Sequence, residues 1–248
     1  MKWSHAAAWR IAGLSLMLAC AGLTHAASLQ VAPTLVAFEP GSKGQALWLS
    51  NTGEDAPVRT QVRVYRWTQH NGEEILEPTT DLVVSPPLAE LNPDARQLVR
   101  IIRTSPMPTD VETSYRLVVD EVPPADSPAH NGLRLLMRYS VPVFVLPDTK
   151  VPPTYQLSTT LEQRDGQTNL VVRNDGGQHA QLADLALLAP DGTRQVLLPG
   201  LVGYILPHQT MRWPLPASSG SLTARGRLQA RINAEADEHV LIDDLAQR

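Results

Sequence analysis

The chain contains 248 residues, with 21 lysines and arginines against 25 aspartates and glutamates, which gives a formal net charge of −4. This balance excludes a basic nucleic-acid-binding protein and offers no attraction to anionic membrane surfaces. The chain has one cysteine, so it cannot form an intramolecular disulfide or a cysteine-based metal site. Its length suffices for one large domain or for two sandwich domains of about 100 residues each.

The first residues are typical of an export signal. Lys2 and Arg10 supply the basic start, residues 11–23 are almost wholly apolar, and residues 24–26 suit cleavage. We therefore assign residues 1–26 to a signal peptide and expect an exported protein. No stretch reaches the roughly 20 apolar residues that a spanning helix needs, so no membrane insertion is expected.

After the signal, short stretches of alternating apolar and polar residues recur between glycine, proline, asparagine and aspartate residues. This spacing is typical of an all-β sandwich. Asn71-Gly72 is the strongest hairpin signal in the chain. We predict seven strands that make one immunoglobulin-like sandwich, at residues 30–38, 45–50, 58–68, 82–85, 96–103, 114–122 and 133–145.

The last of these strands has the most regular alternation. Because side chains of a strand alternate between its faces, its apolar residues form one continuous row. Proline cannot donate to a ladder, so Pro142 indicates a strand at a sheet edge, where an apolar row is a hazard unless it is used. The alternative is an ordinary strand buried in its own core. The row consists of Leu133, Leu135, Met137, Tyr139, Val141, Val143 and Val145.

A proline-rich segment at residues 147–153 then interrupts the pattern, as a stiff connection between domains does. We therefore predict a first domain at residues 27–147 and a second domain at residues 148–248. The second domain is also sandwich-like, although its weaker alternation does not predict the order of its strands. These strands are expected at residues 154–162, 168–174, 180–189, 194–198, 210–215, 225–234 and 240–243.

The sequence offers little support for an enzyme. Motifs for a serine nucleophile or a phosphate-cradling loop are absent from the sequence after the signal. Neighbouring carboxylates on a strand face opposite ways and do not aim at one bond. No histidine pair has metal-ligand spacing, so we expect solvated surface residues and neither cofactor nor metal. These histidines are His70, His130, His179, His208 and His239.

Two arginines form a candidate binding site. If strands 114–122 and 133–145 are antiparallel partners in a symmetric register, Arg116 lies directly opposite Arg138 on the same face. Like charges in this position destabilise a sheet unless an anion lies between them, and the planar guanidinium suits a carboxylate. Arg116 is thus the best candidate anchor for a bound carboxylate. The alternative is a register that differs by one residue, or a nearby aspartate or glutamate that neutralises the arginines.

Several motifs resemble the PapD-like periplasmic chaperones of the chaperone-usher pathway. Residues 131–147 resemble the G1 strand of that family, and residues 203–207 with Trp213 resemble its archaic, Csu-type branch. The motifs are specific only in combination. The other matching segments are Ser85-Pro86-Pro87-Leu88, Leu91-Asn92-Pro93, Leu98-Val99-Arg100-Ile101, Tyr115-Arg116-Leu117 and Asp120-Glu121-Val122-Pro123-Pro124.

The resemblance implies two immunoglobulin-like domains in an L-shaped arrangement and a periplasmic chaperone that needs no cofactor. Such a chaperone binds one pilus subunit, donates its G1 strand to that subunit's incomplete fold, and delivers it to an outer-membrane usher. Main-chain hydrogen bonds provide affinity in this mode, and alternate side chains provide specificity. By position, the donated side chains are Leu133, Leu135 and Met137, with Tyr139 and Val141 as extensions, whereas Val143 and Val145 complete the chaperone's own core.

The chain departs from the best-studied branch of the family at three positions. In that branch an arginine of the first strand and a lysine of G1 hold the subunit's terminal carboxylate, but Leu35 and Pro142 stand at those places here. Leu146 replaces an arginine that joins an interdomain salt bridge. These losses favour the archaic branch and make Arg116, helped by Arg138, the candidate for a relocated anchor.

An exported pilin or adhesin subunit is the alternative function. Pilins of this type have one incomplete domain and often a disulfide, whereas this sequence predicts two strand sets and a complete last strand.

If the protein is a chaperone, its apolar edge strand needs protection when no subunit is bound. A dimer in which each copy covers the other's edge would protect that strand.

Overall fold

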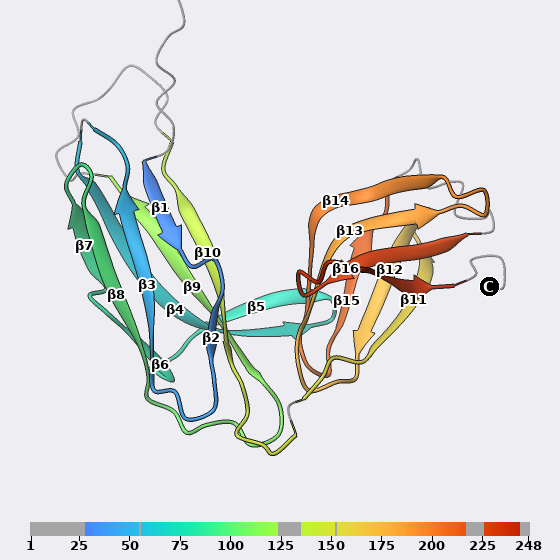
Figure 1. Cartoon of the computed structure of the whole chain (residues 1–248), viewed down its shortest axis with the longest axis horizontal. Helices are drawn as coiled ribbons and strands as arrows, with labels where there is room; N and C mark the ends of the chain where they lie inside the picture. The colour runs from blue at the N-terminus through green and yellow to red at the C-terminus, as the bar shows by residue number, and fades with distance from the viewer. Residues whose placement is uncertain (1–27, 55, 124–134, 152, 217–225, 244–248) are drawn as a thin grey trace, which may run out of the picture.

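The computed structural model describes residues 28–54, 56–123, 135–151, 153–216 and 226–243 (Figure 1). Every regular element in these residues is a β-strand, which confirms the predicted all-β class. The first domain has a four-stranded sheet in the order β1 (Leu29–Ala32), β3 (Gly44–Asn51), β8 (Arg96–Arg103) and β6 (Leu82–Ser85). Its six-stranded sheet has the order β2 (Val36–Phe38), β10 (Arg138–Val145), β9 (Thr113–Val122), β4 (Val58–His70) and β5 (Glu73–Pro78), with β7 (Leu88–Leu91) paired to β4.

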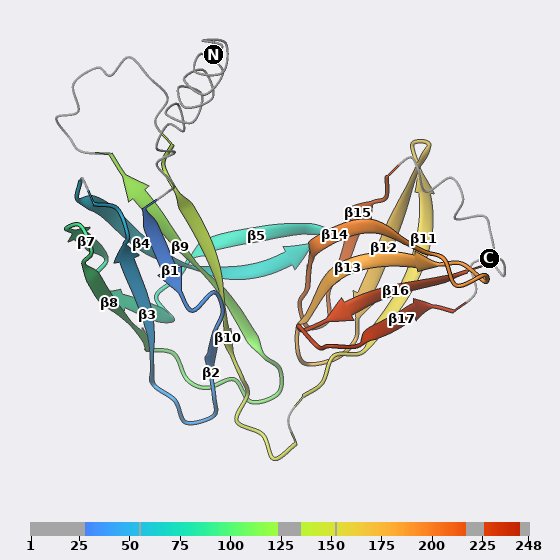
Figure 2. The ribbon, with the colours of Figure 1, turned by 45° about the horizontal axis from the view of Figure 1, so that its top comes forward.

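The second domain is built from the remaining strands, again as two sheets. One sheet has the order β11 (Leu157–Arg164), β12 (Gln167–Asn174) and β15 (Thr210–Pro214). The other has the order β14 (Arg194–Ile205), β13 (Ala180–Leu188), β16 (Arg227–Ile232) and β17 (Glu238–Ile242). Seen from two directions, the sandwiches stand at an angle to each other, as the predicted L-shaped arrangement requires (Figures 1 and 2).

The core of the first domain lies between its two sheets and follows the alternation of the sequence. On β3, Leu47 and Leu49 point inward and are fully buried, while Trp48 between them is 38% exposed. On β10, Val143 and Val145 turn to the same core, as predicted. The apolar row therefore ends inside the first domain, and this buried end fixes which face of β10 points inward.

Strand β10 is an edge strand for part of its length. It pairs with β9 in antiparallel fashion from Arg138 to Val145, but the parallel pairing with β2 covers only Val143–Val145. On that side, residues 138–142 have no strand partner within the described chain. Pro142 lies at the last of these edge positions, so the edge inferred from this proline is confirmed.

The predicted register between the two strands is wrong. Arg116 lies opposite Pro142, four residues further along β10 than Arg138, and Arg138 lies opposite Asp120. A shift by an even number of residues keeps both arginines on the same face of the sheet. The repulsion that suggested an anion between them is nevertheless absent, because each arginine has an acidic neighbour of its own.

The hairpin of β4 and β5 links the two sandwiches (Figure 2). At its turn, Asn71 and Gly72 both have positive φ angles, which the predicted Asn-Gly turn requires. Gly72 forms an isolated β-bridge with Met211 of the second domain. The hairpin thus carries side chains of the first domain onto the second.

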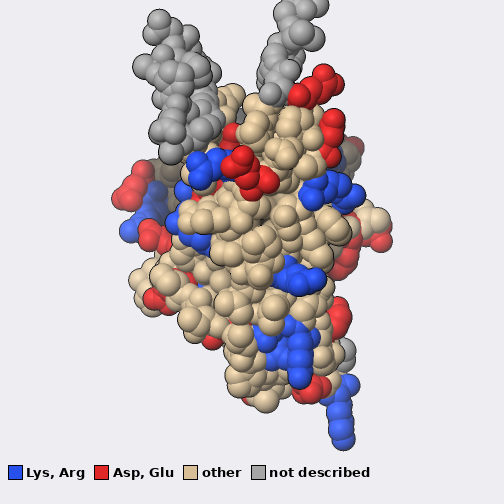
Figure 3. Space-filling model, turned by 90° about the vertical axis from the view of Figure 1, so that its left-hand side faces the viewer, with Lys and Arg blue, Asp and Glu red and all other residues tan. Residues whose placement is uncertain are grey.

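The surface of the first domain carries charges of both signs. Among the described residues on the side shown in Figure 3, acidic and basic side chains are scattered over a mainly uncharged surface. Exposed apolar side chains also occur on the four-stranded sheet, namely Trp48, Val83 and Ile102. This mixture agrees with the small net charge of the chain.

We predict that Leu117→Ala destabilises the protein by about 2 to 5 kcal/mol, because Leu117 is fully buried and its loss leaves a cavity. Val83→Ala is the matched control, since Val83 is 45% exposed and should cost no more than about 0.5 kcal/mol. Urea unfolding measures both values. Equal losses would contradict this placement of the core.

Candidate functional site

The residues that precede β10 present apolar side chains to solvent. Leu135 is 75% exposed and Leu136 is 44% exposed, whereas Met137 is half-buried against the core of the first domain. The backbone continues the pairing with β9, because the Glu121 N–H donates to the Met137 carbonyl at 2.8 Å. An extended, apolar segment is therefore held in place with its side chains partly free.

The remaining residues of the predicted row differ in their surroundings. Tyr139 is half-buried, and its hydroxyl donates a hydrogen bond to the Leu29 carbonyl of β1 across the sandwich. Val141 is only 4% exposed and belongs to the domain's own core. Leu133 lies outside the described residues. The side chains available to a partner are thus those near Leu135 and Met137.

Arg116 lies on the outer face of the six-stranded sheet, where it faces the second domain. Its side chain is 10% exposed. The guanidinium carbon is 3.6 Å from the ring centroid of Trp67 and 5.1 Å from that of Tyr204, a residue of the second domain. Stacking on aromatic faces of this kind holds a cation in a fixed orientation.

One carboxylate lies beside this guanidinium. Nη2 of Arg116 is 3.4 Å from Oε1 of Glu74, whose side chain is 42% exposed. Burial lowers the pKa of Arg116, and the charge of Glu74 partly opposes that effect. The indole N–H of Trp67 is also buried and has no hydrogen-bond partner among the described residues. The Arg116 guanidinium and the Trp67 indole N–H are thus two neighbouring donor groups, and Glu74 is the carboxylate paired with the first of them.

Arg138 does not join this group. It forms an ion pair with Asp120, which also binds Arg63 at 2.5 Å. Partial burial acts to raise the pKa of Asp120, but the hydrogen bonds from Arg138 and Arg63 outweigh it and hold the pKa below its usual value. The side chain of Arg138 is 68% exposed, so this pair lies at the surface.

The two domains meet through a cluster of aromatic rings. Trp67 and Phe144 of the first domain pack against Tyr204 and Leu206 of the second, and all four are buried. The rings of Trp67 and Tyr204 meet edge to face with centroids 5.3 Å apart. His179 stacks flat on Phe144 at 3.5 Å, which extends the cluster. This contact positions Arg116 in the angle between the domains.

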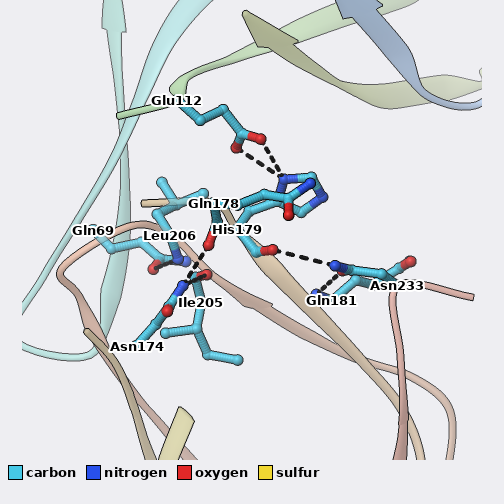
Figure 4. Close-up of polar contacts among 9 residues, drawn as sticks. All are labelled: Gln69, Glu112, Asn174, Gln178, His179, Gln181, Ile205, Leu206 and Asn233. Atoms are coloured by element: carbon cyan, nitrogen blue, oxygen red, sulfur yellow. Dashed lines mark hydrogen bonds and ion pairs between the residues drawn. The ribbon is translucent and has the colours of Figure 1, made fainter. Parts of the chain in front are cut away.

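Buried polar side chains also join the two domains (Figure 4). Both carboxylate oxygens of Glu112 lie within 2.9 Å of Nδ1 of His179, and the Glu112 side chain is 1% exposed. Gln69 donates to the Tyr204 carbonyl and accepts from the Leu206 N–H. The prediction of a solvated His179 is therefore wrong, because the docking of the two domains buries it.

The loop before His179 is shaped by one asparagine. The Asn174 amide donates to the carbonyls of Gln178 and Ile205 (Figure 4), and its oxygen accepts from the Gly176 N–H. A Cβ on Gly176 would lie 2.2 Å from the Thr154 carbonyl oxygen, so the loop requires glycine there. These contacts set His179 in line with Glu112. The spacing of residues along the sequence cannot predict the pairing of Glu112 with His179, because the two residues come from different domains.

Within the described residues, no group of three or more histidine, cysteine, aspartate or glutamate side chains is placed to hold a metal ion. Likewise, the described part of the chain contains no helix that is long and apolar enough to cross a membrane.

Comparisons with known proteins agree with this architecture. Residues 28–150 match the family described as Pili and flagellar-assembly chaperone, PapD N-terminal domain. The chaperone protein PmfD of Proteus mirabilis is 26% identical over 204 residues, which cover 79% of this chain and 76% of PmfD. The uncharacterized fimbrial chaperone YbgP of Escherichia coli is 26% identical over 220 residues, covering 85% of this chain and 86% of YbgP.

Solved structures show the same fold. The CsuC–CsuE chaperone–tip subunit complex of Acinetobacter baumannii contains a chain that matches 86% of this one over 97% of its own length, with a TM-score of 0.67 and 22% identity. The SafA pilin–SafB chaperone complex of Salmonella enterica contains a chain that matches 88% of this one over 98% of its own length, with a TM-score of 0.60 and 21% identity.

We predict that His179→Ala destabilises the protein by about 3 to 5 kcal/mol, because it leaves the Glu112 carboxylate buried without its partner. His239 is the matched control, since it pairs with Glu235 at 2.6 Å but at the surface, where the loss should stay within about 1 kcal/mol. Thermal and urea unfolding test this. Similar losses in both variants would contradict a role in domain docking.

Proposed function

We propose that this chain captures pilus subunits in the periplasm, because it belongs to the PapD-like family of chaperones of the chaperone-usher pathway. The observation that carries this proposal is the edge of β10, where exposed apolar side chains precede residues 138–142, which have a strand partner on one side only within the described chain. In the solved complexes named above, chaperones of this fold are joined to a pilus subunit. A one-to-one complex with a subunit is therefore the expected product.

The capture step is strand addition. The subunit lacks a strand, and β10 with the residues before it supplies main-chain donors and acceptors along the open edge. Leu135 and Met137 then enter the subunit's core, with Leu133 before them. Tyr139 extends this row only when its hydroxyl leaves the Leu29 carbonyl that it binds in the free protein. Val141 is already buried in this protein's own core, so its part is to hold β10 in register.

Arg116 is the proposed anchor for the subunit's terminal carboxylate. The side chain is almost wholly buried, and it stacks on Trp67 with Tyr204 nearby. Charge-assisted bonds between arginine and a carboxylate are strong where water is excluded. Arg138, the second candidate, pairs with Asp120 and lies at the surface. We therefore expect it to contribute less than Arg116 to binding of the carboxylate.

The proposal also covers location and onward transfer. An N-terminal signal peptide at residues 1–26, which lie outside the described residues, delivers the protein to the periplasm. From there the loaded complex passes its subunit to an outer-membrane usher, and strand addition needs no catalysis or cofactor. Two copies that cover each other's β10 edge would protect the free protein. The pilin alternative is less favoured, because the first domain has its own last strand.

We predict that Arg116→Ala weakens the complex with a co-expressed pilin by about 2 to 5 kcal/mol, since a buried charged contact loses one partner. Arg138→Ala is the control and should have a much smaller effect. Co-purification of the complex from periplasmic extracts measures both. Unchanged recovery with Arg116→Ala would place the anchor elsewhere, and a pilin that is stable without this protein would contradict the chaperone function.

We also predict that Leu135→Glu blocks capture of the subunit and leaves the free protein folded. The side chain is 75% exposed here, so a charge is solvated in the free state but would be buried in the complex. Circular dichroism checks the fold and co-purification checks capture. A misfolded variant would mean that Leu135 belongs to this protein's own core.

A further inference from the structure

In the contact between Glu74 and Arg116, the arginine side chain is held much more firmly than the glutamate side chain. Arg116 is fixed, because its side chain is almost buried and stacks on the ring of Trp67 next to that of Tyr204, whereas Glu74 is 42% exposed. The contact consists of one pair of atoms 3.4 Å apart, long for a charge-assisted hydrogen bond. Rotation of Glu74 into solvent would therefore cost little, while the guanidinium would stay where it is.

The location of Glu74 explains how it reaches Arg116. The backbone of Arg116 is level with Tyr65 on β4, but Glu74 on β5 is level with Gln69. The arginine side chain must therefore run along the sheet, across the ring of Trp67, to meet the carboxylate. Gln69, the cross-strand neighbour of Glu74, is bonded to the second domain. The docked domains hold this meeting point in place.

We propose that Glu74 is an internal substitute for the carboxylate that Arg116 binds, and that an incoming carboxylate displaces it. The inference rests on the proposed function, since it assigns a role to a neighbour of the proposed anchor. Without a ligand, Glu74 supplies the negative charge that a desolvated guanidinium requires. When a subunit arrives, its terminal carboxylate takes that place and Glu74 turns to solvent.

The exchange has a consequence for selectivity. A tethered carboxylate competes with every free anion at an effective concentration set by its attachment, so weakly bound anions are kept out. A subunit overcomes this competition because its strand adds the hydrogen bonds of the β10 edge. Glu74 thereby couples occupation of the anchor to strand addition.

The test measures the binding of two synthetic peptides to the purified protein. Both have the same alternating apolar and polar residues, but one ends in a free carboxylate and the other in an amide. Glu74→Gln removes the competing charge, so the affinity for the carboxylate peptide should rise by about two- to fivefold, as expected for a lost exposed ion pair. The affinity for the amide peptide should stay the same.

Two further variants make the result specific. Glu77→Gln makes the same charge change on the opposite face of β5, where it should alter neither affinity. Glu74→Asp keeps the charge on a shorter side chain, so its gain should be smaller than that of Glu74→Gln. Circular dichroism confirms that each variant is folded.

The outcomes separate the two proposals. If neither Glu74 variant gains affinity, or if both peptides gain equally, the substitute role of Glu74 is wrong while Arg116 can remain the anchor. If the wild-type protein does not prefer the carboxylate peptide, or if Arg116→Gln leaves that preference intact, then the anchor itself is wrong and the role of Glu74 falls with it.

Discussion

The contact between the two sandwiches depends on aromatic rings that come from distant parts of the chain. Trp67 on β4 and Phe144 on β10 meet Tyr204 on β14, and His179 is stacked on Phe144. Aromatic pairs of this kind contribute about 0.5 to 1.5 kcal/mol each beyond the area that they bury. Because Arg116 lies on one of these rings and near another, the same contact that sets the angle between the domains also orients the proposed anchor.

Strand β10 connects this joint to the surface that a partner would meet. Its end carries Phe144 into the joint and Val143 and Val145 into the core of the first domain, so this end cannot slide. Its beginning has an open edge and follows the exposed Leu135. Within a few residues, β10 therefore changes from a strand that is packed in its own domain to one with an open edge. In the proposed strand addition, another chain could pair with this edge while the first domain stays folded.

The sequence predicted those features that rest on local patterns. The alternation of apolar residues along residues 133–145 predicted the core residues, and Pro142 predicted the edge. Both signals are local, because alternation lies within one strand and proline itself lacks the backbone N–H donor. The register between β10 and β9 was predicted wrongly, because the length of the sequence between two strands does not determine their register. The contact of Asp120 with Arg138 depends on that register, so it was missed as well. The Glu112–His179 pair joins two domains, so no spacing along the chain could reveal it.

In the proposed capture step, the open edge of β10 pairs with a strand of the bound subunit. Backbone amide hydrogen exchange of the free protein and of its complex with a co-expressed pilin tests this directly. We predict that amides in residues 135–141 exchange much more slowly in the complex, while those of β3 are unchanged. A stable complex in which residues 135–141 exchange as fast as in the free protein would contradict it.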